Sequence, residues 1–433
     1  MRTRTQSISQ GPGLWQIRFY SLCFIALLLA SCASAPYHGA SVESQNFLDR
    51  VVMQQQGDLQ VSVAVPDAGE TLQLTGLDLY EQGIQPVWLK IENRGEDRVR
   101  IATWSIDREY FSPIEVAYMN RKKFSKQGYS DMERWFYKNG LPRFVPPGET
   151  RSGLVFTHLR PGTKGFNLVI FTRNSARDFT FFVPLPGFVP DFEEVDFESL
   201  YDPEEFLDLD RTGLMSVLED DLGCCAVDSS GELLGVPLNV VLVGSGMAIR
   251  RAMLRGDWFE TSMQDNVAFR AREQYFNGRR PDGIYSKIRP DGNERLQIGL
   301  WLSPWKFNSE HVWIGFVYYF TEENSLLAGL DDETVRNSEL LSFFSRESVS
   351  ADLDSAQGFL FQNVWYNGSL RALGWLEGVG AAPVDKPRTG FEGNAYFTDG
   401  LRLLLHLSEE PMAIDDASLY RFHPYKPLQL RSE

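Results

Sequence analysis

Histidine and cysteine are scarce in this chain, and their scarcity excludes several common catalytic centres. Five histidines and four cysteines occur among 433 residues. No two histidines stand at a metal-ligand spacing, and no CxxC pair is present. The sequence also lacks the HExxH motif, the GxSxG nucleophile elbow and the P-loop. These absences predict no catalytic constellation, no cofactor and no metal centre.

Positive charge is also in short supply. Lysine and arginine number 42 against 58 aspartates and glutamates, which gives a formal net charge of −16. Such an excess disfavours nucleic acid and anionic lipid surfaces as partners of the whole body. Hydrophobic residues make up 43% of the chain and aromatic residues 13%, which argues against wholesale disorder. The length is enough for two or three domains.

The N-terminal apolar run is too short to be a membrane span. Residues 19–30 are mostly apolar, whereas a spanning helix needs about 20 such residues. The leader before them carries arginines and no acidic residue. Small residues then precede Cys32, and residues 29–32 resemble a bacterial lipobox. We therefore predict a lipoprotein signal peptide over residues 1–31; the alternatives are an ordinary cleaved secretory signal and a retained anchor.

The lipobox resemblance implies that Cys32 becomes the lipidated mature N-terminus. Two or more acyl chains would make attachment lasting. Ala33 stands where an aspartate would suggest inner-membrane retention in that family, so we expect the periplasmic face of the outer membrane. Cleavage removes three arginines and shifts the formal charge to about −19. Residues 32–57 are polar and are predicted to be a tether.

Short runs with alternating apolar side chains fill residues 58–187. Alternate residues of 87–92 are apolar, and turn signals rich in proline and glycine separate this run from the later ones. This spacing predicts an all-β sandwich. The polar stretch 122–139 is rich in helix formers and predicts one helix inserted between strands.

Residues 188–221 are rich in aspartate and glutamate and form an acidic joint between the two predicted domains. Carboxylates suit calcium, but no EF-hand spacing is present. The acidic residues alternate with aromatic ones such as Phe197, Tyr201 and Phe206. These aromatics favour a segment docked on a neighbouring domain over an ion site.

Residues 222–433 predict a β-rich α+β domain. The continuous apolar run 238–243 indicates a strand buried on both faces. Gly244-Ser245-Gly246 then turns the chain into a helix ended by Gly256. The turn is similar to a dinucleotide-binding fingerprint, but Ile249 replaces its third glycine, so a tight turn is favoured.

Further elements are expected in this domain. Two Arg-Pro-Asp-Gly segments, 280–283 and 289–292, predict type I turns, and Asp331-Asp332 predicts a helix start. The expected strands are 296–301, 312–320, 358–365, 370–376 and 401–407. The overall fold class is therefore mixed: an all-β sandwich domain followed by a β-rich α+β domain.

Several short motifs of this half carry a family resemblance. They are Cys224-Cys225 and Trp258, with residues 237–244, 280–282, 300–301, 312–315 and 396–401. Their order resembles that of the LssY C-terminal-like domain, over residues 222–412. The family supplies no established chemistry, although some relatives join this domain to lipid-phosphatase-like membrane modules. Relatives often carry histidines before the segments matching 300–301 and 331–332, and this chain has none there.

Two groups of candidate site residues stand out in this half. Cys224 and Cys225 are adjacent and form either a vicinal disulfide or a pair of buried thiols, with a redox or ligand role as the weaker alternative. Trp301, Trp305 and Trp313 lie on or beside one predicted hairpin. These tryptophans could form a ligand surface for glycan or lipid, although aromatics in strands are more often core.

Four carboxylates are the remaining candidates. They are Asp282, Asp291, Asp332 and Glu333. Turn and helix-cap roles explain all four without chemistry.

The sequence favours an outer-membrane-anchored lipoprotein that binds or scaffolds. Its partners would be the membrane, through the lipid anchor, and an envelope protein, lipid or glycan. The alternative is a lipid or phospholipid hydrolase-like activity in the C-terminal domain.

Overall fold

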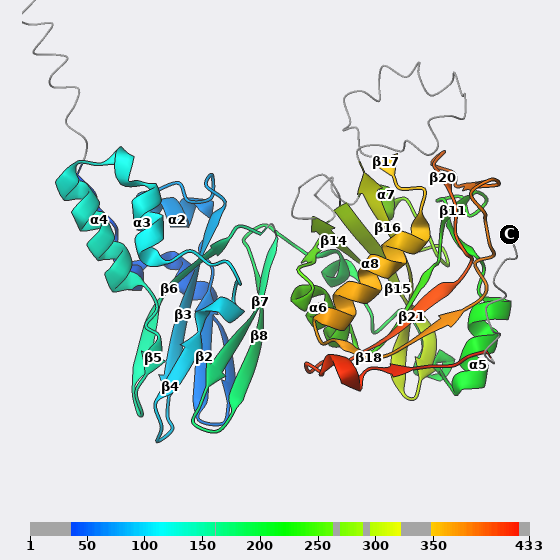
Figure 1. Cartoon of the computed structure of the whole chain (residues 1–433), viewed down its shortest axis with the longest axis horizontal. Coiled ribbons are helices and arrows are strands. Elements are labelled where there is room, and N and C mark those ends of the chain that lie inside the picture. The colour runs from blue at the N-terminus through cyan, green and yellow to red at the C-terminus, as the bar shows by residue number, and fades with distance from the viewer. Residues whose placement is uncertain (1–35, 161, 263–268, 289–294, 322–347, 424–433) are drawn as a thin grey trace, which may run out of the picture. The chain divides into compact units, whose positions relative to one another are not determined.

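The computed structural model describes residues 36–160, 162–262, 269–288, 295–321 and 348–423. The chain divides into two compact units, Met1–Leu159 with Leu168–Phe179 and Arg160–Asn167 with Thr180–Glu433. Strands outnumber helices in both, so the prediction of a mixed, β-rich fold is confirmed (Figure 1).

The β-sandwich contains two four-stranded sheets. The first sheet has the order β1-β2-β3-β6, with β1 (Val52–Gln56), β2 (Leu59–Ala64), β3 (Ile84–Asn93) and β6 (Thr150–His158). The second has the order β5-β4-β7-β8, with β5 (Phe144–Val145), β4 (Val99–Ala102), β7 (Thr163–Phe171) and β8 (Ala176–Pro184). Val63 of β2 lies opposite Leu89 of β3, and both are fully buried. The alternating apolar residues therefore face the core, as the sequence pattern predicts.

Three α-helices accompany the first sheet: α2 (Ala68–Thr75), α3 (Pro113–Met119) and α4 (Lys126–Asn139). Helix α4 confirms the predicted helix and begins four residues later, where the Ser125 hydroxyl accepts a hydrogen bond from the Gly128 N–H. Met132 and Phe136 are buried and belong to the same core cluster as Trp88 of β3. Helix α4 therefore covers the face of this sheet on which Trp88 lies.

The second unit is built on one large sheet. Its strand order is β13-β14-β15-β16-β12-β21-β18-β22, with β17 added beside β16 and β9 beside β15. The bounds are β9 (Leu207–Leu209), β12 (Val240–Val243), β13 (Phe259–Glu260), β14 (Gly283–Ile288), β15 (Arg295–Phe307), β16 (Glu310–Thr321), β17 (Ser348–Val349), β18 (Leu370–Leu376), β21 (Arg402–Leu407) and β22 (Ser418–Leu419). Strands β12 and β21 run parallel, and the long β15–β16 hairpin is antiparallel. The predicted buried strand at 238–243 is therefore the central strand β12.

Side chains of the central strand alternate between two separate cores. Val240 and Leu242 belong to the core packed under helices α6 (Gly246–Arg255) and α8 (Leu353–Tyr366), which we call the helix-covered face. Val241 and Val243 belong to the core on the opposite side, which includes Trp301, Phe316 and Tyr318 and which we call the closed face. Figure 1 shows α8 crossing in front of the strands. The unit is therefore a sheet with both faces buried.

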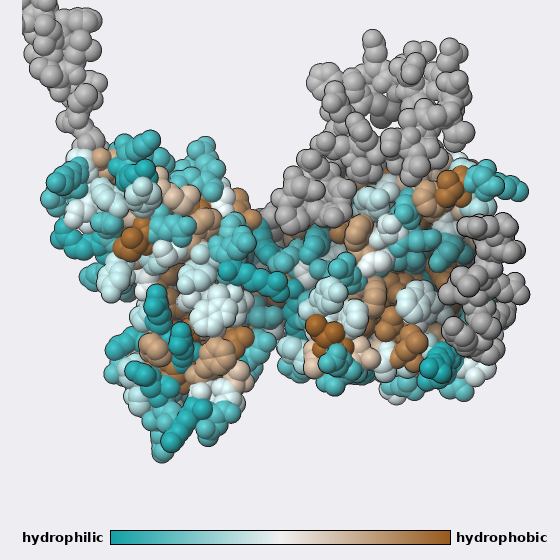
Figure 2. Space-filling view, in the orientation of Figure 1, coloured by the Kyte–Doolittle hydropathy of each residue, from teal (hydrophilic) through white to brown (hydrophobic). Residues whose placement is uncertain are grey.

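Smaller elements complete the second unit. They are α5 (Arg211–Ser216), β10 (Cys225–Val227), β11 (Leu234–Pro237), α7 (Phe269–Arg272), β19 (Arg388–Thr389) and β20 (Ala395–Tyr396). On the visible face of this unit, apolar residues reach the surface in small patches separated by polar residues (Figure 2). None of the described helices is long and apolar enough to cross a bilayer.

Two sequence-based predictions are wrong in this unit. Residues 358–365, predicted as a strand, lie inside helix α8, whose N-terminus is capped by the Asp352 side chain. The type I turn predicted at residues 280–283 is also wrong. The chain turns earlier, at Asn277-Gly278, where both residues have positive φ, and Pro281 and Asp282 lead into β14. The second Arg-Pro-Asp-Gly segment and the helix expected at Asp331-Asp332 lie outside the described residues.

Candidate functional site

The acidic joint packs onto the second unit through its aromatic residues. Phe197, Leu200, Tyr201 and Phe206 contact the core of the helix-covered face. The Tyr201 hydroxyl donates to the Leu302 carbonyl at 3.0 Å. The neighbouring strand β9 pairs in parallel with the end of β15. Among the described residues no group of three or more His, Cys, Asp or Glu side chains could hold a metal ion.

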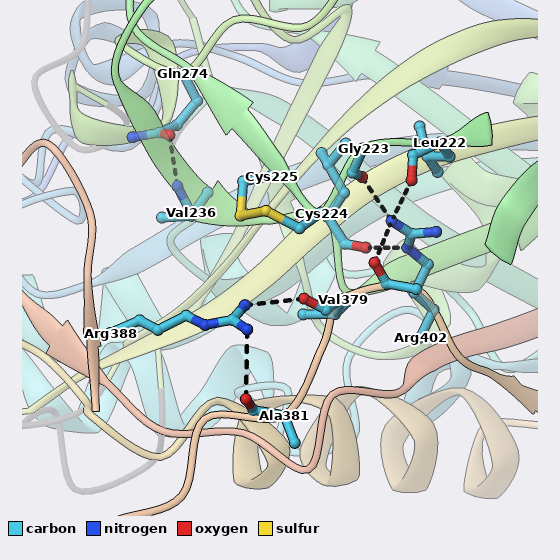
Figure 3. The surroundings of a disulfide bond; sticks show 12 residues. Leu222, Gly223, Cys224, Cys225, Val236, Gln274, Val379, Ala381, Arg388 and Arg402 are labelled. Atoms are coloured by element: carbon cyan, nitrogen blue, oxygen red, sulfur yellow. Dashed lines mark hydrogen bonds between the residues drawn. A yellow bond between two sulfur atoms is a disulfide. The ribbon is translucent and has the colours of Figure 1, made fainter. Parts of the chain in front are cut away.

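Cys224 and Cys225 are joined in a vicinal disulfide, one of the two alternatives drawn from the sequence (Figure 3). Beside it lies the fully buried guanidinium of Arg402, which donates to the carbonyls of Leu222 and Gly223 at 3.1 and 2.6 Å. Further carbonyls, of Leu218, Leu238 and Gly378, also accept from it. Burial lowers the pKa of Arg402 to about 10. The backbone carbonyls next to the disulfide therefore accept hydrogen bonds from the buried cation of Arg402.

The three tryptophans do not form a common ligand surface, which corrects the sequence-based prediction. Trp301 is fully buried in the closed face, and its indole N–H donates to the Arg279 carbonyl at 3.0 Å. Trp305 packs against the same core. Trp313 lies in the core of the helix-covered face and donates to the Gly244 carbonyl at 3.1 Å. Because the sheet is covered on both sides, alternate aromatics of its strands become core residues.

Asp282 is held by partners within the fold. It is buried, accepts from Arg279 at 2.5 Å and accepts from the Leu302 N–H at 2.7 Å. Burial raises its pKa, against the opposing effect of Arg279. The other carboxylate candidates, Asp291, Asp332 and Glu333, lie outside the described residues, as does Cys32.

The helix-covered face contains a cavity of about 310 Å³, which we call the chamber. The floor comes from β14, β15 and β16, and the sides from α6 and from residues 192–197 of the acidic joint. Apolar lining side chains include Phe192, Phe197, Ile249, Leu300, Leu302 and Trp313. A concave, mostly apolar site of this size is typical of a small-ligand pocket.

Glycine contributes to the space in the chamber. A Cβ at Gly283 would meet only the Tyr285 ring and the Phe192 Cβ, at 3.8 and 3.9 Å. A Cβ at Gly246 would lie 3.8 Å from the Trp313 ring. Both are ordinary contact distances, so larger side chains at these two positions would extend into the chamber without striking the backbone.

The polar groups that line the chamber fall into two classes. Arg250 and Asp282 are ion-paired within the chain, with Glu260 and Arg279 respectively. The side chains of Tyr285 and His311 form no hydrogen bond with any described residue, although Tyr285 is only 5% exposed. Burial raises the pKa of Tyr285, and burial lowers the pKa of His311. Both side chains are therefore uncharged at neutral pH.

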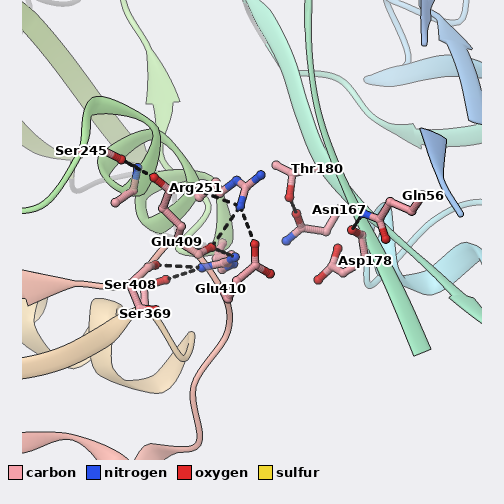
Figure 4. Close-up of polar contacts among 12 residues, drawn as sticks. Gln56, Asn167, Asp178, Thr180, Ser245, Arg251, Ser369, Ser408, Glu409 and Glu410 are labelled. Carbon is pink, nitrogen blue, oxygen red and sulfur yellow. Dashed lines mark hydrogen bonds and ion pairs between the residues drawn. The ribbon is translucent and has the colours of Figure 1, made fainter. Parts of the chain in front are cut away.

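A polar groove of about 480 Å³ adjoins the chamber at His311, which lines both. The groove lies where the parallel strands β12 and β21 end and α6 begins. Ser245 donates to Glu409 at 2.5 Å, and Arg251 pairs with Glu410 at 2.9 Å (Figure 4). The carboxyl ends of parallel strands beside a helix N-terminus are a frequent location of binding sites in α/β proteins.

Beneath the groove, a buried histidine connects a tyrosine to a glutamate. His406 Nδ1 lies 2.7 Å from the Tyr420 hydroxyl, and Nε2 lies 3.1 Å from Glu310. Arg371 also pairs with Glu310, at 2.5 Å. Burial lowers the pKa of His406 more than Glu310 raises it. The network is therefore internally paired around a neutral imidazole.

Sequence reasoning missed Tyr285, His311 and the chamber. Tyr285 lies in a short alternating strand, and His311 is one isolated histidine among five. No local motif marks either residue, because the chamber is assembled from segments far apart in the chain. A scan of the chain against protein-family models found no match, and a search of curated proteins found none either.

Proposed function

We propose that this protein is an envelope lipoprotein, anchored through Cys32, whose C-terminal unit binds a small apolar or amphiphilic molecule in the chamber. The observation that carries the proposal is the chamber itself, an apolar cavity on an otherwise close-packed sheet. A concave site of about 310 Å³ with a mostly apolar lining has the size and character of a small-molecule site.

The lining favours an apolar ligand over a peptide or a sugar. Phe192, Phe197 and Trp313 offer aromatic surface, and Ile249 and Leu300 offer aliphatic surface. Burying apolar ligand area stabilises a complex by about 25 cal/mol per Å². Of the three partner classes considered from the sequence, lipid therefore fits best.

The anchor and its location belong to the same proposal. The lipobox at residues 29–32 and Ala33 support attachment at the periplasmic face of the outer membrane. The motif order over residues 222–412 supports an LssY C-terminal-like domain. Incorporation of labelled palmitate into the wild type and its loss in Cys32→Ala are the expected results; equal labelling of both would contradict the anchor.

Ligand binding can be tested with the fluorescent apolar probe N-phenyl-1-naphthylamine. We expect the signal-free chain carrying Cys32→Ala to bind the probe, with energy transfer from Trp313. Gly283→Leu and Gly246→Leu should each weaken binding at least tenfold, because both fill the chamber.

The matched control is Gly358→Leu on the exposed side of α8, where a Cβ meets no heavy atom within 4 Å. This variant should bind the probe as the wild type does. Absence of probe binding to the wild type, or equal binding by all four chains, would exclude the chamber as a ligand site.

One observation favours the alternative of a lipid hydrolase. Glu310 and His406 form a linked acid–base pair at the polar groove beside the chamber. Turnover of a phospholipid panel that His406→Gln abolishes would support this alternative. No turnover by the wild type would remove it and leave binding as the function.

A further inference from the structure

We infer that the ligand of the chamber is an uncharged molecule with an apolar body and a hydroxyl or carbonyl oxygen, bound by Tyr285 and His311. This inference rests on the proposed binding function and adds the chemical class of the ligand.

The ionic groups at the chamber already have partners in the chain. Arg250 Nε donates to Glu260 at 2.7 Å, and its guanidinium also lies 4.3 Å from the centre of the Phe192 ring. Asp282 is held by Arg279 and by the Leu302 N–H. A carboxylate or ammonium brought into the chamber would lose its hydration, and the charged groups that line the chamber are already ion-paired. Lys306, close to His311, lies over the Phe206 ring and does not line the chamber. Burial of an unpaired charge is strongly unfavourable, so the site selects against both.

Tyr285 is the first unsatisfied polar group. Its side chain comes from β14, lines the chamber and is almost fully buried, yet its hydroxyl has no hydrogen-bond partner among the described residues. A phenol hydroxyl without a partner in the fold can form a hydrogen bond with an oxygen of a bound molecule. Burial also raises its pKa, so the phenol stays protonated and can donate to a ligand oxygen.

The side chain of His311 is the second polar group at the chamber without a hydrogen-bond partner among the described residues. Its Nδ1 is enclosed and unpaired, and Nε2 forms no hydrogen bond with any described residue. Burial and the nearby Lys306 both lower its pKa, which keeps the ring neutral at pH 7. Because His311 lines both the chamber and the groove, it can bind a ligand oxygen where the two cavities meet.

Competition against N-phenyl-1-naphthylamine tests the ligand class. Decan-1-ol, decanoate and decyltrimethylammonium have the same chain length and differ in charge. At pH 7.5 we expect decan-1-ol to displace the probe at concentrations at least tenfold lower than either ion. Tyr285→Phe should weaken decan-1-ol binding about three- to tenfold, a larger change than in probe binding.

Tyr318→Phe is the matched control, because it removes a buried tyrosine hydroxyl from the closed face, away from the chamber. This variant should keep the wild-type preference for decan-1-ol. Equal or stronger displacement by decanoate or decyltrimethylammonium would overturn the inference, as would unchanged decan-1-ol binding by Tyr285→Phe. Either result leaves the proposed binding function intact, whereas failure of the probe to bind at all would refute the binding function itself.

Discussion

The two faces of the large sheet differ in the hydrogen bonding of their buried tyrosines. Tyr318 on the closed face donates to Gln297 at 2.9 Å, and Gln297 in turn donates to Ser286. Tyr285 on the helix-covered face is also buried, at 5% exposed against 1% for Tyr318, and has no such partner among the described residues. The closed face therefore uses its polar groups to hold the fold, whereas the helix-covered face leaves two uncharged groups available.

Arg402 is a second buried polar group on the closed face that is fully hydrogen-bonded. Its guanidinium is fully buried and surrounded by backbone carbonyls from three separate segments of the chain, residues 218–223, Leu238 and Gly378. A buried charge without a counter-ion is stable only when hydrogen bonds replace its hydration. The cation thus ties β21 to the segment that carries Cys224 and Cys225.

The largest expected effect comes from removing that cation. Arg402→Met keeps an unbranched apolar side chain but leaves the carbonyls of Leu222, Gly223 and Leu238 without their donor. We expect the free energy of unfolding of the second unit to fall by about 3–5 kcal/mol. Chemical denaturation followed by tryptophan fluorescence measures it. Arg421→Met at an exposed position should change stability by less than about 0.5 kcal/mol; similar losses in both variants would show that Arg402 does not hold the closed face together.

The next largest effect is the difference in stability between Tyr318→Phe and Tyr285→Phe. Tyr318→Phe leaves the Gln297 side-chain oxygen unsatisfied and should cost about 1–3 kcal/mol of unfolding free energy. Tyr285→Phe removes a hydroxyl with no partner and should be neutral or slightly stabilising in the absence of ligand. Thermal and denaturant unfolding of the two variants provide the measurement. A large loss in Tyr285→Phe would mean that this hydroxyl supports the fold and not a ligand.

A smaller effect concerns His406, whose neighbours Phe307 and Tyr420 pack on the closed face. Burial lowers the pKa of His406 in the folded state, so below pH 6.5 the unfolded chain binds more protons than the folded one. The stability that the neutral ring contributes is present above that pH and is lost as pH falls toward the folded pKa.

We expect His406 to contribute about 1 kcal/mol to the loss of stability between pH 7.5 and 5, so the loss should be smaller by that amount in His406→Gln. Unfolding free energies measured at both pH values in both chains give the difference. His38→Gln, at an exposed site in the first unit, controls for the loss of a histidine. Identical pH dependence in the wild type and His406→Gln would show that the ring is not held neutral by burial.

Much of the fold follows from local patterns, and the chamber does not. Strands β2 and β3 alternate cleanly, and α4 ends at Asn139, the last residue of the predicted helix. The turn at Asn277-Gly278 also had a local signal, since Asn-Gly favours positive φ at both positions. The turn was instead predicted three residues later, because Pro281 and Asp282 are also typical turn residues. The chamber depends on which segments the acidic joint and α6 bring together, and no local pattern specifies that.

The error at α8 has a physical cause as well. Phe359, Leu360 and Phe361 form a short apolar run with no clear period, which fits a buried strand as well as a helix. The deciding features are the Asp352 cap and the helical spacing of Ala356, Leu360 and Val364, all three fully buried. Trp301 and Trp305 do not join Trp313 on one surface for a related reason, because the sheet face on which each side chain lies is decided by the tertiary structure.

The smallest expected effect tests helix α8 on the helix-covered face. Gly358 lies on the exposed side of α8, and a Cβ there would meet no heavy atom within 4 Å. Glycine inside a helix costs about 0.5–1 kcal/mol relative to alanine, because its unfolded backbone has more freedom to lose. Gly358→Ala should therefore raise the unfolding free energy by that amount and leave probe binding in the chamber unchanged, as measured by thermal unfolding and N-phenyl-1-naphthylamine titration. If residues 358–365 formed a strand, the gain would be absent, and the chamber would lack one of the two helices that distinguish its face from the closed one.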